Sequence, residues 1–177
     1  SGINVISGSN DISASGNTIH TSNADARGIH VYLSRNVIAE SNTITTESTG
    51  AYGIYSASDE GTPENERTSI LIEGNTINSR SFDTAAIYSL YSAGAGFVAL
   101  ENMIEVADGA GIQIFSTNNA VLGNNTIHNN GSYYGNSGYY GIYVVSSDNF
   151  VFSDDHIVID GNRGSGILLQ SSKNGMI

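Results

Sequence analysis

The chain has 177 residues, with 6 lysines and arginines against 17 aspartates and glutamates, and its formal net charge is −11. So few cations exclude a nucleic-acid-binding protein that works by neutralising phosphates, and they argue against binding to an anionic membrane surface. There is no cysteine and no long apolar run, which excludes a disulfide framework, a thiolate metal site, a cysteine nucleophile and a membrane-spanning segment.

Glycine, serine and asparagine together supply 66 of the residues, whereas lysine and proline occur once each. Such a composition is common in disordered chains. However, 39% of the residues are hydrophobic, mostly isoleucine, valine, leucine, tyrosine and alanine, which is enough to build a core. We therefore expect a folded domain rather than a disordered chain.

The first predicted element of each unit is a strand that opens with a Gly-Ile or Ala-Ile dipeptide. Successive isoleucines of this dipeptide are 26, 25, 33, 25, 30 and 25 residues apart. They are Ile3, Ile29, Ile54, Ile87, Ile112, Ile142 and Ile167. The base unit therefore has about 25 residues, and the two long units carry insertions near residues 59–67 and 131–140. Both insertions are polar or glycine-rich, which is typical of surface loops.

Two further strands follow in each unit. An Asn-Thr-Ile motif, or a degenerate form of it, marks the last strand and places Ile19, Ile44, Ile77, Ile104, Ile127 and Ile157. Six residues earlier an aliphatic residue marks the middle strand, at Ile38, Leu71, Val98, Val121 and Val151, and Ile12 fits after one extra residue. Short alternating apolar segments indicate strands, and no long window has helical periodicity. Three short strands cannot bury an apolar face alone, so we expect the units to stack on one another.

An asparagine recurs eight residues after the anchor glycine in five of the seven units. Asparagine tolerates the left-handed backbone of sharp turns, and its amide can pair with an asparagine one coil above and below. We therefore predict a structural ladder of asparagines along the axis, formed by Asn10, Asn36, Asn119, Asn149 and Asn174.

The stretches Gly28–Ile44 (GIHVYLSRNVIAESNTI) and Gly141–Ile157 (GIYVVSSDNFVFSDDHI) resemble the repeat of pectin-lyase-like proteins. The resemblance implies an all-β fold, a right-handed parallel β-helix with three short strands per coil and internal ladders of like residues. It covers nearly the whole chain, which we expect to form a single domain over residues 1–177 with about six and a half coils. Polysaccharide lyases, glycosidases, epimerases, phage tailspikes and adhesins share this fold, so the fold alone does not define the function.

The outward position after each anchor isoleucine carries the candidate ligand-binding residues. Neighbouring coils stack about 4.8 Å apart, so the side chains at this position form a row. We predict that this row binds a ligand and that its tyrosines form a platform for sugar rings; its residues are His30, Tyr55, Tyr88, Gln113 and Tyr143. Tyr52, Tyr139 and Tyr140 lie just before the same strands. The alternative is that the tyrosines only stabilise the sheet as stacked cross-strand pairs.

Acidic residues supply the candidate metal ligands. Glu40 and Glu73 lie four residues before their Asn-Thr-Ile isoleucines, and Glu101 lies three residues before its own. Like charges on adjacent strands repel, so this stripe is either fully solvated or shares a Ca²⁺ ion, which favours carboxylate and carbonyl oxygens. We expect no cofactor otherwise, and Ca²⁺ is the one candidate.

The segment Ser153–Asp160, SDDHIVID, holds the candidate catalytic residues Asp154, Asp155 and His156. It is similar to part of the carboxylate-rich sites of pectin-acting hydrolases, but the Gly-His-Gly and Arg-Ile-Lys motifs of those enzymes are absent. Asp155 takes the place of a turn asparagine. No cation matches a lyase motif, and the acidic surface would repel a polyuronate.

We expect a structural or binding segment of an extracellular or cell-surface, bacterial protein, similar to an adhesin, with a glycan or a host-surface protein as its partner. The alternative is a carbohydrate-active enzyme, a hydrolase more than a lyase, that acts on a polysaccharide. The lack of cysteine and scarcity of lysine resemble long secreted bacterial surface proteins. Because no capping helix precedes Gly2 or follows Ile177, we expect the β-helix to continue in a longer parent chain.

Overall fold

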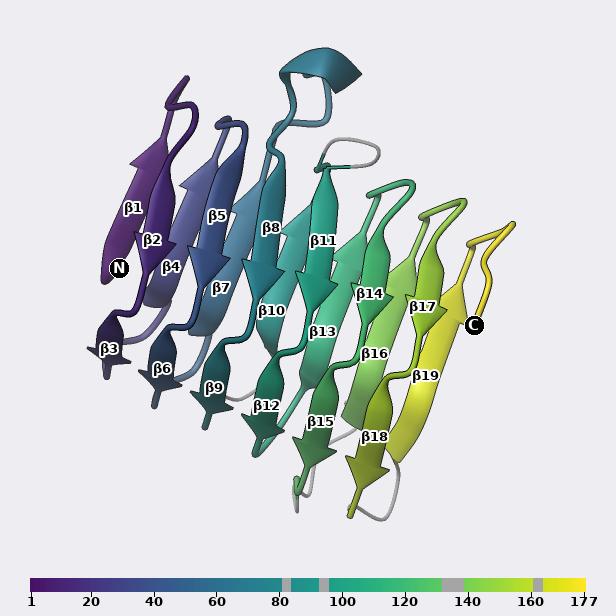
Figure 1. Ribbon diagram of the computed structural model, residues 1–177. Helices are drawn as coiled ribbons and strands as arrows, with labels where there is room; N and C mark the ends of the chain where they lie inside the picture. The colour runs from purple at the N-terminus through teal and green to yellow at the C-terminus, as the bar shows by residue number, and fades with distance from the viewer. Residues whose placement is uncertain (81–83, 93–95, 132–138, 161–163) are drawn as a thin grey trace.

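The computed structural model describes residues 1–80, 84–92, 96–131, 139–160 and 164–177. In these ranges the chain winds into a parallel β-solenoid, in which each coil contributes a strand to each of three sheets (Figure 1). Each strand pairs in parallel with the equivalent strands of the neighbouring coils, and the first and last strands of each sheet have one such neighbour. The predicted all-β solenoid with three short strands per coil is confirmed.

The first sheet has seven strands and carries the predicted ligand-binding row. Its strands are β1 (Ile3–Ile6), β4 (Arg27–Tyr32), β7 (Tyr52–Ala57), β10 (Ala85–Leu90), β13 (Ala110–Phe115), β16 (Tyr139–Val145) and β19 (Gly164–Gln170). The strands of the second sheet are β2 (Ser13–Ser15), β5 (Val37–Glu40), β8 (Ile70–Glu73), β11 (Phe97–Leu100), β14 (Val121–Gly123) and β17 (Val151–Ser153). Those of the third sheet are β3 (Thr18–Thr21), β6 (Thr43–Thr46), β9 (Thr76–Ser79), β12 (Met103–Val106), β15 (Thr126–Asn129) and β18 (His156–Ile159).

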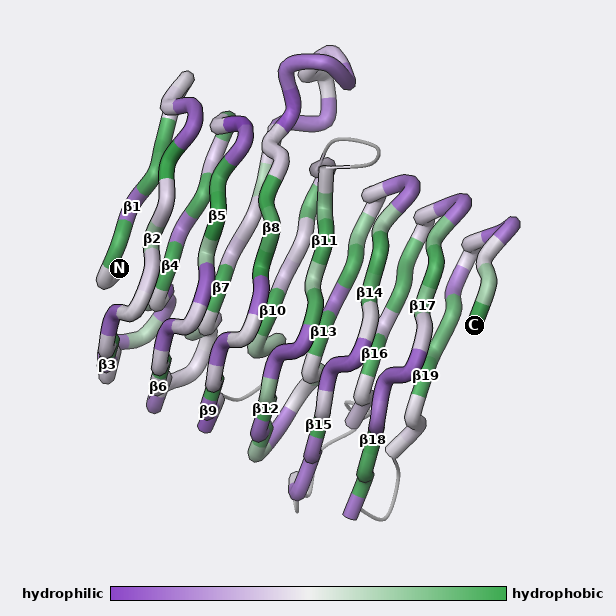
Figure 2. Tube along the Cα trace, in the orientation of Figure 1, coloured by the Kyte–Doolittle hydropathy of each residue, from purple (hydrophilic) through white to green (hydrophobic). Residues whose placement is uncertain are grey.

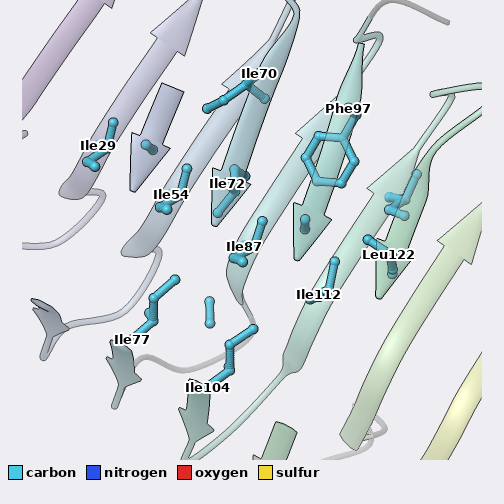
Figure 3. Close-up of a cluster of buried hydrophobic side chains, with 14 of the residues drawn as sticks. Ile29, Ile54, Ile70, Ile72, Ile77, Ile87, Phe97, Ile104, Ile112 and Leu122 are labelled. Atoms are coloured by element: carbon cyan, nitrogen blue, oxygen red, sulfur yellow. The ribbon is translucent and has the colours of Figure 1, made fainter. Parts of the chain in front are cut away.

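The register of the first sheet joins all seven predicted anchor isoleucines in one row, from Ile3 and Ile29 to Ile167. The Asn-Thr-Ile isoleucines form a second row, on the third sheet. Figure 3 shows both rows pointing into the solenoid, and Ile54 of the first and Ile44 of the second are fully buried. The repeat spacing therefore predicted both the register and the inward direction of these two rows.

Adjacent coils approach closely at the corner before most anchor isoleucines, and this favours glycine there. At Gly28, an added Cβ would lie 2.4 Å from Ile44 Cγ2 and 2.5 Å from the carbonyl oxygen of Gly53. Real Cβ atoms do not approach a backbone oxygen so closely, so a larger residue has to push two coils apart. Ala86 holds the equivalent place in one coil, where it is fully buried.

The aliphatic residues that mark the middle strands are in register on the second sheet, but they face outward. Ile38 is 37% exposed, whereas its neighbours Val37 and Ala39 are buried. The reason is the turn between β5 and β6, where Ser41 has a φ of 53°. This left-handed residue interrupts the alternation of side chains, so a spacing of six residues does not return to the same face.

The first coil also differs from the prediction, because its β1–β2 turn contains one residue more than the turn of the next coil. Ser13, not Ile12, therefore pairs with Ile38. By the same offset, Asp11 rather than Asn10 has the left-handed backbone, with a φ of 58°. The coils without insertions accordingly have 25 or 26 residues.

Hydrophobic residues follow the strands, and hydrophilic residues gather at the turns (Figure 2). The loop predicted as an insertion near residues 59–67 contains a short 3-10 helix, η1 (Glu64–Glu66), and projects from one edge of the solenoid (Figure 1). The other predicted insertion, near residues 131–140, falls mostly on residues 132–138, which lie outside the described residues. In the described ranges, no helix is both long and apolar enough to cross a membrane.

Candidate functional site

The five predicted ligand-binding residues lie in one row on the outer face of the first sheet. The register joins them in the order His30, Tyr55, Tyr88, Gln113 and Tyr143. All five side chains are half-buried. The residues on either side of this row point into the core, so the row forms one surface along the axis of the solenoid.

The densest part of this surface is a cluster that we call the aromatic patch, formed by Arg27, His30, Tyr52, Tyr55 and Tyr88. The rings of Tyr55 and Tyr88 are stacked, with centroids 5.3 Å apart and planes inclined by 20°. Tyr52 packs against both, at 5.1 Å from Tyr55 and 5.2 Å from Tyr88. The Arg27 Cζ atom lies 4.0 Å from the ring centroid of Tyr55, and the His30 ring lies 5.4 Å from it.

The stacking determines which parts of the tyrosines a ligand can contact. Tyr55 lies between Arg27 of the preceding coil and Tyr88 of the following coil, so neighbours occupy both faces of its ring. At Tyr55, what remains for a ligand is the ring edge and the hydroxyl group, rather than an open face. Burial raises the pKa of the Tyr88 hydroxyl, and burial together with Tyr55 raises that of Tyr52. Both hydroxyls therefore keep their protons and can donate hydrogen bonds.

His30 connects the patch to the first coil. Its Nε2 lies 3.1 Å from Arg27 Nη1, and its Nδ1 lies 3.2 Å from Asn4 Oδ1. Since arginine only donates, Nε2 accepts and the ring proton sits on Nδ1, from which it is donated to Asn4. Burial and the charge of Arg27 lower the pKa of His30 to about 4, so the imidazole is neutral at neutral pH. Arg27 is consequently the positive charge of the patch.

The rest of the row is a separate cluster. Tyr143 packs against Tyr140 with ring centroids 4.8 Å apart, and its hydroxyl donates to Gln170 Oε1 at 2.7 Å. Gln113 stands between Tyr88 and Tyr143 in the register, so the predicted row consists of two aromatic groups rather than one continuous platform.

The loop that contains η1 is attached beside the patch. The Tyr32 hydroxyl donates to Asp59 Oδ1 at 2.6 Å, and Arg35 Nη1 donates to the carbonyl of Asn65 at 2.8 Å. The Tyr32 ring lies 6.3 Å from the ring of His30. A carboxylate, that of Asp59, therefore lies at the edge of the patch.

The three predicted metal ligands occupy two different columns. Glu40 and Glu73 are paired across β5 and β8 on the outer face of the second sheet. Leu100, not Glu101, continues their column, and Glu101 lies in the following turn with a φ of 55°. Within the ranges that the structure describes, no three or more histidine, aspartate or glutamate side chains gather to hold a metal ion.

The three predicted catalytic residues point in different directions. Asp155 Oδ1 accepts from the backbone N–H of Asn125 at 2.9 Å and from Asn125 Nδ2 at 2.8 Å. Its other oxygen, Oδ2, is buried without a hydrogen-bond partner, and burial raises the pKa of this carboxyl group. Asp154 is exposed in a turn, and His156 is exposed at the start of β18. The structure therefore does not bring these side chains together.

A hydrogen-bonded asparagine ladder is present, but it lies within the Asn-Thr-Ile motif. The Nδ2 of Asn17 donates to Oδ1 of Asn42 at 3.0 Å. The same bond repeats coil by coil along Asn42, Asn75, Asn102, Asn125 and Asp155. Each of the four inner asparagines also donates Nδ2 to a backbone carbonyl, on Ala14, Ala39, Ile72 and Ala99 in turn.

The column where we predicted the ladder is a column of turns. Asn36, Asn119, Asn149 and Asn174 have φ values of 54°, 55°, 57° and 56°, the left-handed backbone expected of them. The Asn36 amide donates to the Asp11 carboxylate at 3.0 Å. These four residues all lie in the described ranges, and their side-chain amides do not hydrogen-bond to one another along the axis.

Sequence reasoning missed the role of Arg27. Arg27 pairs with Tyr52 two residues before the anchor isoleucine. Regular alternation would place such a residue on the inward face of Ile29, so the spacing carried no signal for its position beside the predicted row. The ladder asparagines stood in the motif that we used as an anchor. The sequence did not indicate that these asparagines point inward, because a polar residue before a strand is typical of an exposed turn.

The comparisons with known proteins agree with this architecture. A family model described as "Right handed beta helix region" matches residues 1–177. No curated protein and no solved structure matches the chain. Since the family model covers the whole chain and the structure is a three-sheet parallel solenoid, the chain belongs to the right-handed β-helix family.

Proposed function

We propose that the chain is a rigid binding segment of an extracellular or cell-surface protein, and that its aromatic patch contacts a glycan. The observation that carries the proposal is the patch itself, a cation and four rings on the outer face of a sheet. The core beneath this face is complete without them, since Ile29, Ile54 and Ile87 are fully buried. The hydrophobic core therefore does not require this surface, although stacked tyrosines also pair across neighbouring strands.

The chemistry of the patch suits a polyhydroxylated ligand. The tyrosine hydroxyls remain protonated, the ring edges are apolar, and Arg27 supplies charged donors. These groups stand on strands that are fixed by pairing on both sides, so little conformational entropy is lost on binding. Stacked coils also give the segment length and stiffness, as a surface protein needs.

An enzymatic role would require convergent acid and base groups beside the bound sugar. Near the patch, Asp59 is bound to the Tyr32 hydroxyl. Asp154, Asp155 and His156 lie at the second and third sheets, away from the row on the first sheet. No observation on the described residues favours the enzyme over the binding segment.

A glycan microarray tests the proposal, followed by calorimetry on the best ligands. We expect Tyr88→Leu to weaken binding at least roughly tenfold, the effect of losing one good polar and packing contact. Met103→Ala is the matched control, because Met103 is 58% exposed on the third sheet, and it should leave the affinity unchanged. Absence of glycan binding by the folded wild type would overturn the proposal.

A further inference from the structure

Arg27 is held in the aromatic patch without a carboxylate partner. In the described residues, Arg80 forms an ion pair with Glu47, and His20 and His128 contact Glu47 and Asp160. Arg27, in contrast, contacts the His30 ring through Nη1, and its buried Nε has no hydrogen-bond partner. Of the five N–H donors of this guanidinium, the Nε–H is buried and Nη1 faces His30, which leaves the remaining donors at the Nη1 and Nη2 end for a ligand.

The neighbours of Arg27 fix its position without neutralising its charge. The ring of Tyr55 lies 4.0 Å from its Cζ atom and holds the guanidinium by a cation–π interaction. His30 is neutral and accepts from it, so it contributes neither a second positive charge nor a negative one. A guanidinium that is already held in place can bind an oxyanion at a low entropic cost.

We propose that Arg27 forms an anion subsite within the aromatic patch, and that the ligand is a glycan in which one carboxylate-bearing sugar adjoins neutral sugars. This inference rests on the proposed glycan binding and defines its substrate class. The planar guanidinium matches a carboxylate in a bidentate arrangement, while the hydroxyls of Tyr52 and Tyr88 are available for the neutral sugars.

The surrounding charges favour a single acidic sugar over a polyuronate. Asp59 lies at one edge of the patch, on the hydroxyl of Tyr32. Asp25 is close enough to Tyr52 that its charge adds to the effects of burial and Tyr55, which raise the pKa of that hydroxyl. A polymer with a carboxylate on every sugar would place further negative charges near these groups, on a chain with a net charge of −11.

Matched pairs of oligosaccharides test the subsite by calorimetry. The probes are lactose with 3′-sialyllactose, xylotetraose with the same oligomer carrying one glucuronic acid branch, and polygalacturonate. We expect the single-carboxylate member of a pair to bind more tightly, and its affinity alone to fall as salt is raised. Arg27→Gln should weaken its binding roughly tenfold or more and weaken the binding of its neutral counterpart clearly less.

Arg80→Gln is the matched control, because it removes the same charge from an exposed ion pair with Glu47. It should change the affinity for neither probe, and circular dichroism establishes that each variant is folded. Should Arg27→Gln fail to fold, Arg27→Lys can replace it. Lysine keeps the positive charge but cannot form the bidentate contact, so this variant should lose part of the preference for the carboxylate-bearing sugar.

The outcomes separate the two proposals. Equal loss of both members of a pair in Arg27→Gln, or a preference of the wild type for polygalacturonate, overturns the anion subsite and leaves glycan binding intact. Binding of only the neutral probes by the wild type would also overturn the anion subsite and leave glycan binding intact. If the folded wild type binds none of the probes and no glycan on the array, the proposed function fails, and the subsite fails with it.

Discussion

Asp155 forms the last rung of the asparagine ladder in the described chain, and its Oδ1 accepts the Nδ2–H of Asn125 at 2.8 Å. One coil earlier, Asn125 donates its own Nδ2 to the carbonyl of Ala99 at 2.9 Å. Leu122 is the residue in register with Ala99 on the next coil. By this register, Asp155 Oδ2 takes the place of an asparagine Nδ2 that would donate to the Leu122 carbonyl. Oδ2 is buried and has no hydrogen-bond partner. A proton on Oδ2 would restore the missing hydrogen bond.

Asp155→Asn should stabilise the protein at neutral pH by about 1 kcal/mol, since an amide donates at every pH. Burial raises the pKa of Asp155 in the folded state above the value of about 3.9 in the unfolded chain. The folded state then binds more protons above about pH 4, so stability falls as the pH rises through the folded pKa. Because other groups, His30 among them, titrate in the same range, this slope should appear as the difference between the wild type and the variant in urea unfolding from about pH 3 to 8.

Asp154→Asn is the matched control for this substitution. Asp154 is exposed in the same turn, with a φ of 57° that asparagine also tolerates. It should leave the pH slope in place. A pH slope that persists unchanged in Asp155→Asn would contradict the protonated rung.

His30 should titrate at about pH 4 in the folded protein, because burial and Arg27 disfavour its charged form. Its pKa in the unfolded chain is about 6.5, so the unfolded state binds more protons between these values. This group therefore adds stability above about pH 6.5 and loses it as the pH falls towards 4, the opposite sign to Asp155. Following the imidazole Cε1–H by NMR measures the pKa directly.

Arg27→Gln should raise the pKa of His30, because it removes the second of the two main causes of its lowering. A wild-type His30 that titrates near its unfolded value would show that the imidazole is not held in the patch as described.

Asn75→Ala should destabilise the protein by roughly 3 kcal/mol, because it interrupts the ladder at a buried rung. Asn75 Oδ1 accepts from both the backbone N–H and the Nδ2 of Asn42, and its own Nδ2 donates to the carbonyl of Ala39. The substitution leaves these groups buried and unsatisfied. Asn78→Ala, a half-buried outward residue on the same strand β9, should change the urea midpoint little. Similar losses from both variants would argue against a structural ladder.

Gly111→Ala should cost about 1–3 kcal/mol, the usual range for overpacking. Its Cβ would lie 2.4 Å from Ile127 Cγ2 and 2.7 Å from the carbonyl oxygen of Gly141 on the next coil. Gly61→Ala is the control, because no atom lies within 4 Å of its added Cβ. Thermal unfolding of the two variants distinguishes the tight corner from a general effect of replacing glycine.

The sequence predicted the solenoid well because the coils stack one on another in a constant register. A side chain at a fixed place in each unit then meets its counterpart one coil away, so the spacing of Ile29, Ile54 and their equivalents translates directly into a buried row. The same logic predicted the outward row of His30, Tyr55 and Tyr88, because these residues directly follow the anchors on a regular strand.

Where a turn intervenes, the repeat spacing still predicts which residues align but not which way they face. The left-handed residue Ser41 makes Ile38 face outward and leaves Asn42 buried, so the inward polar ladder was placed in another column. The side-chain contacts between coils could not be predicted from the spacing either. The stacking of Tyr55 between Arg27 and Tyr88, and the separation of Asp155 from its neighbours, depend on side-chain directions that spacing does not contain. Repetition along the axis thus determined the fold from the sequence, whereas local backbone geometry at the turns and packing across the coils decided the chemistry of its surface.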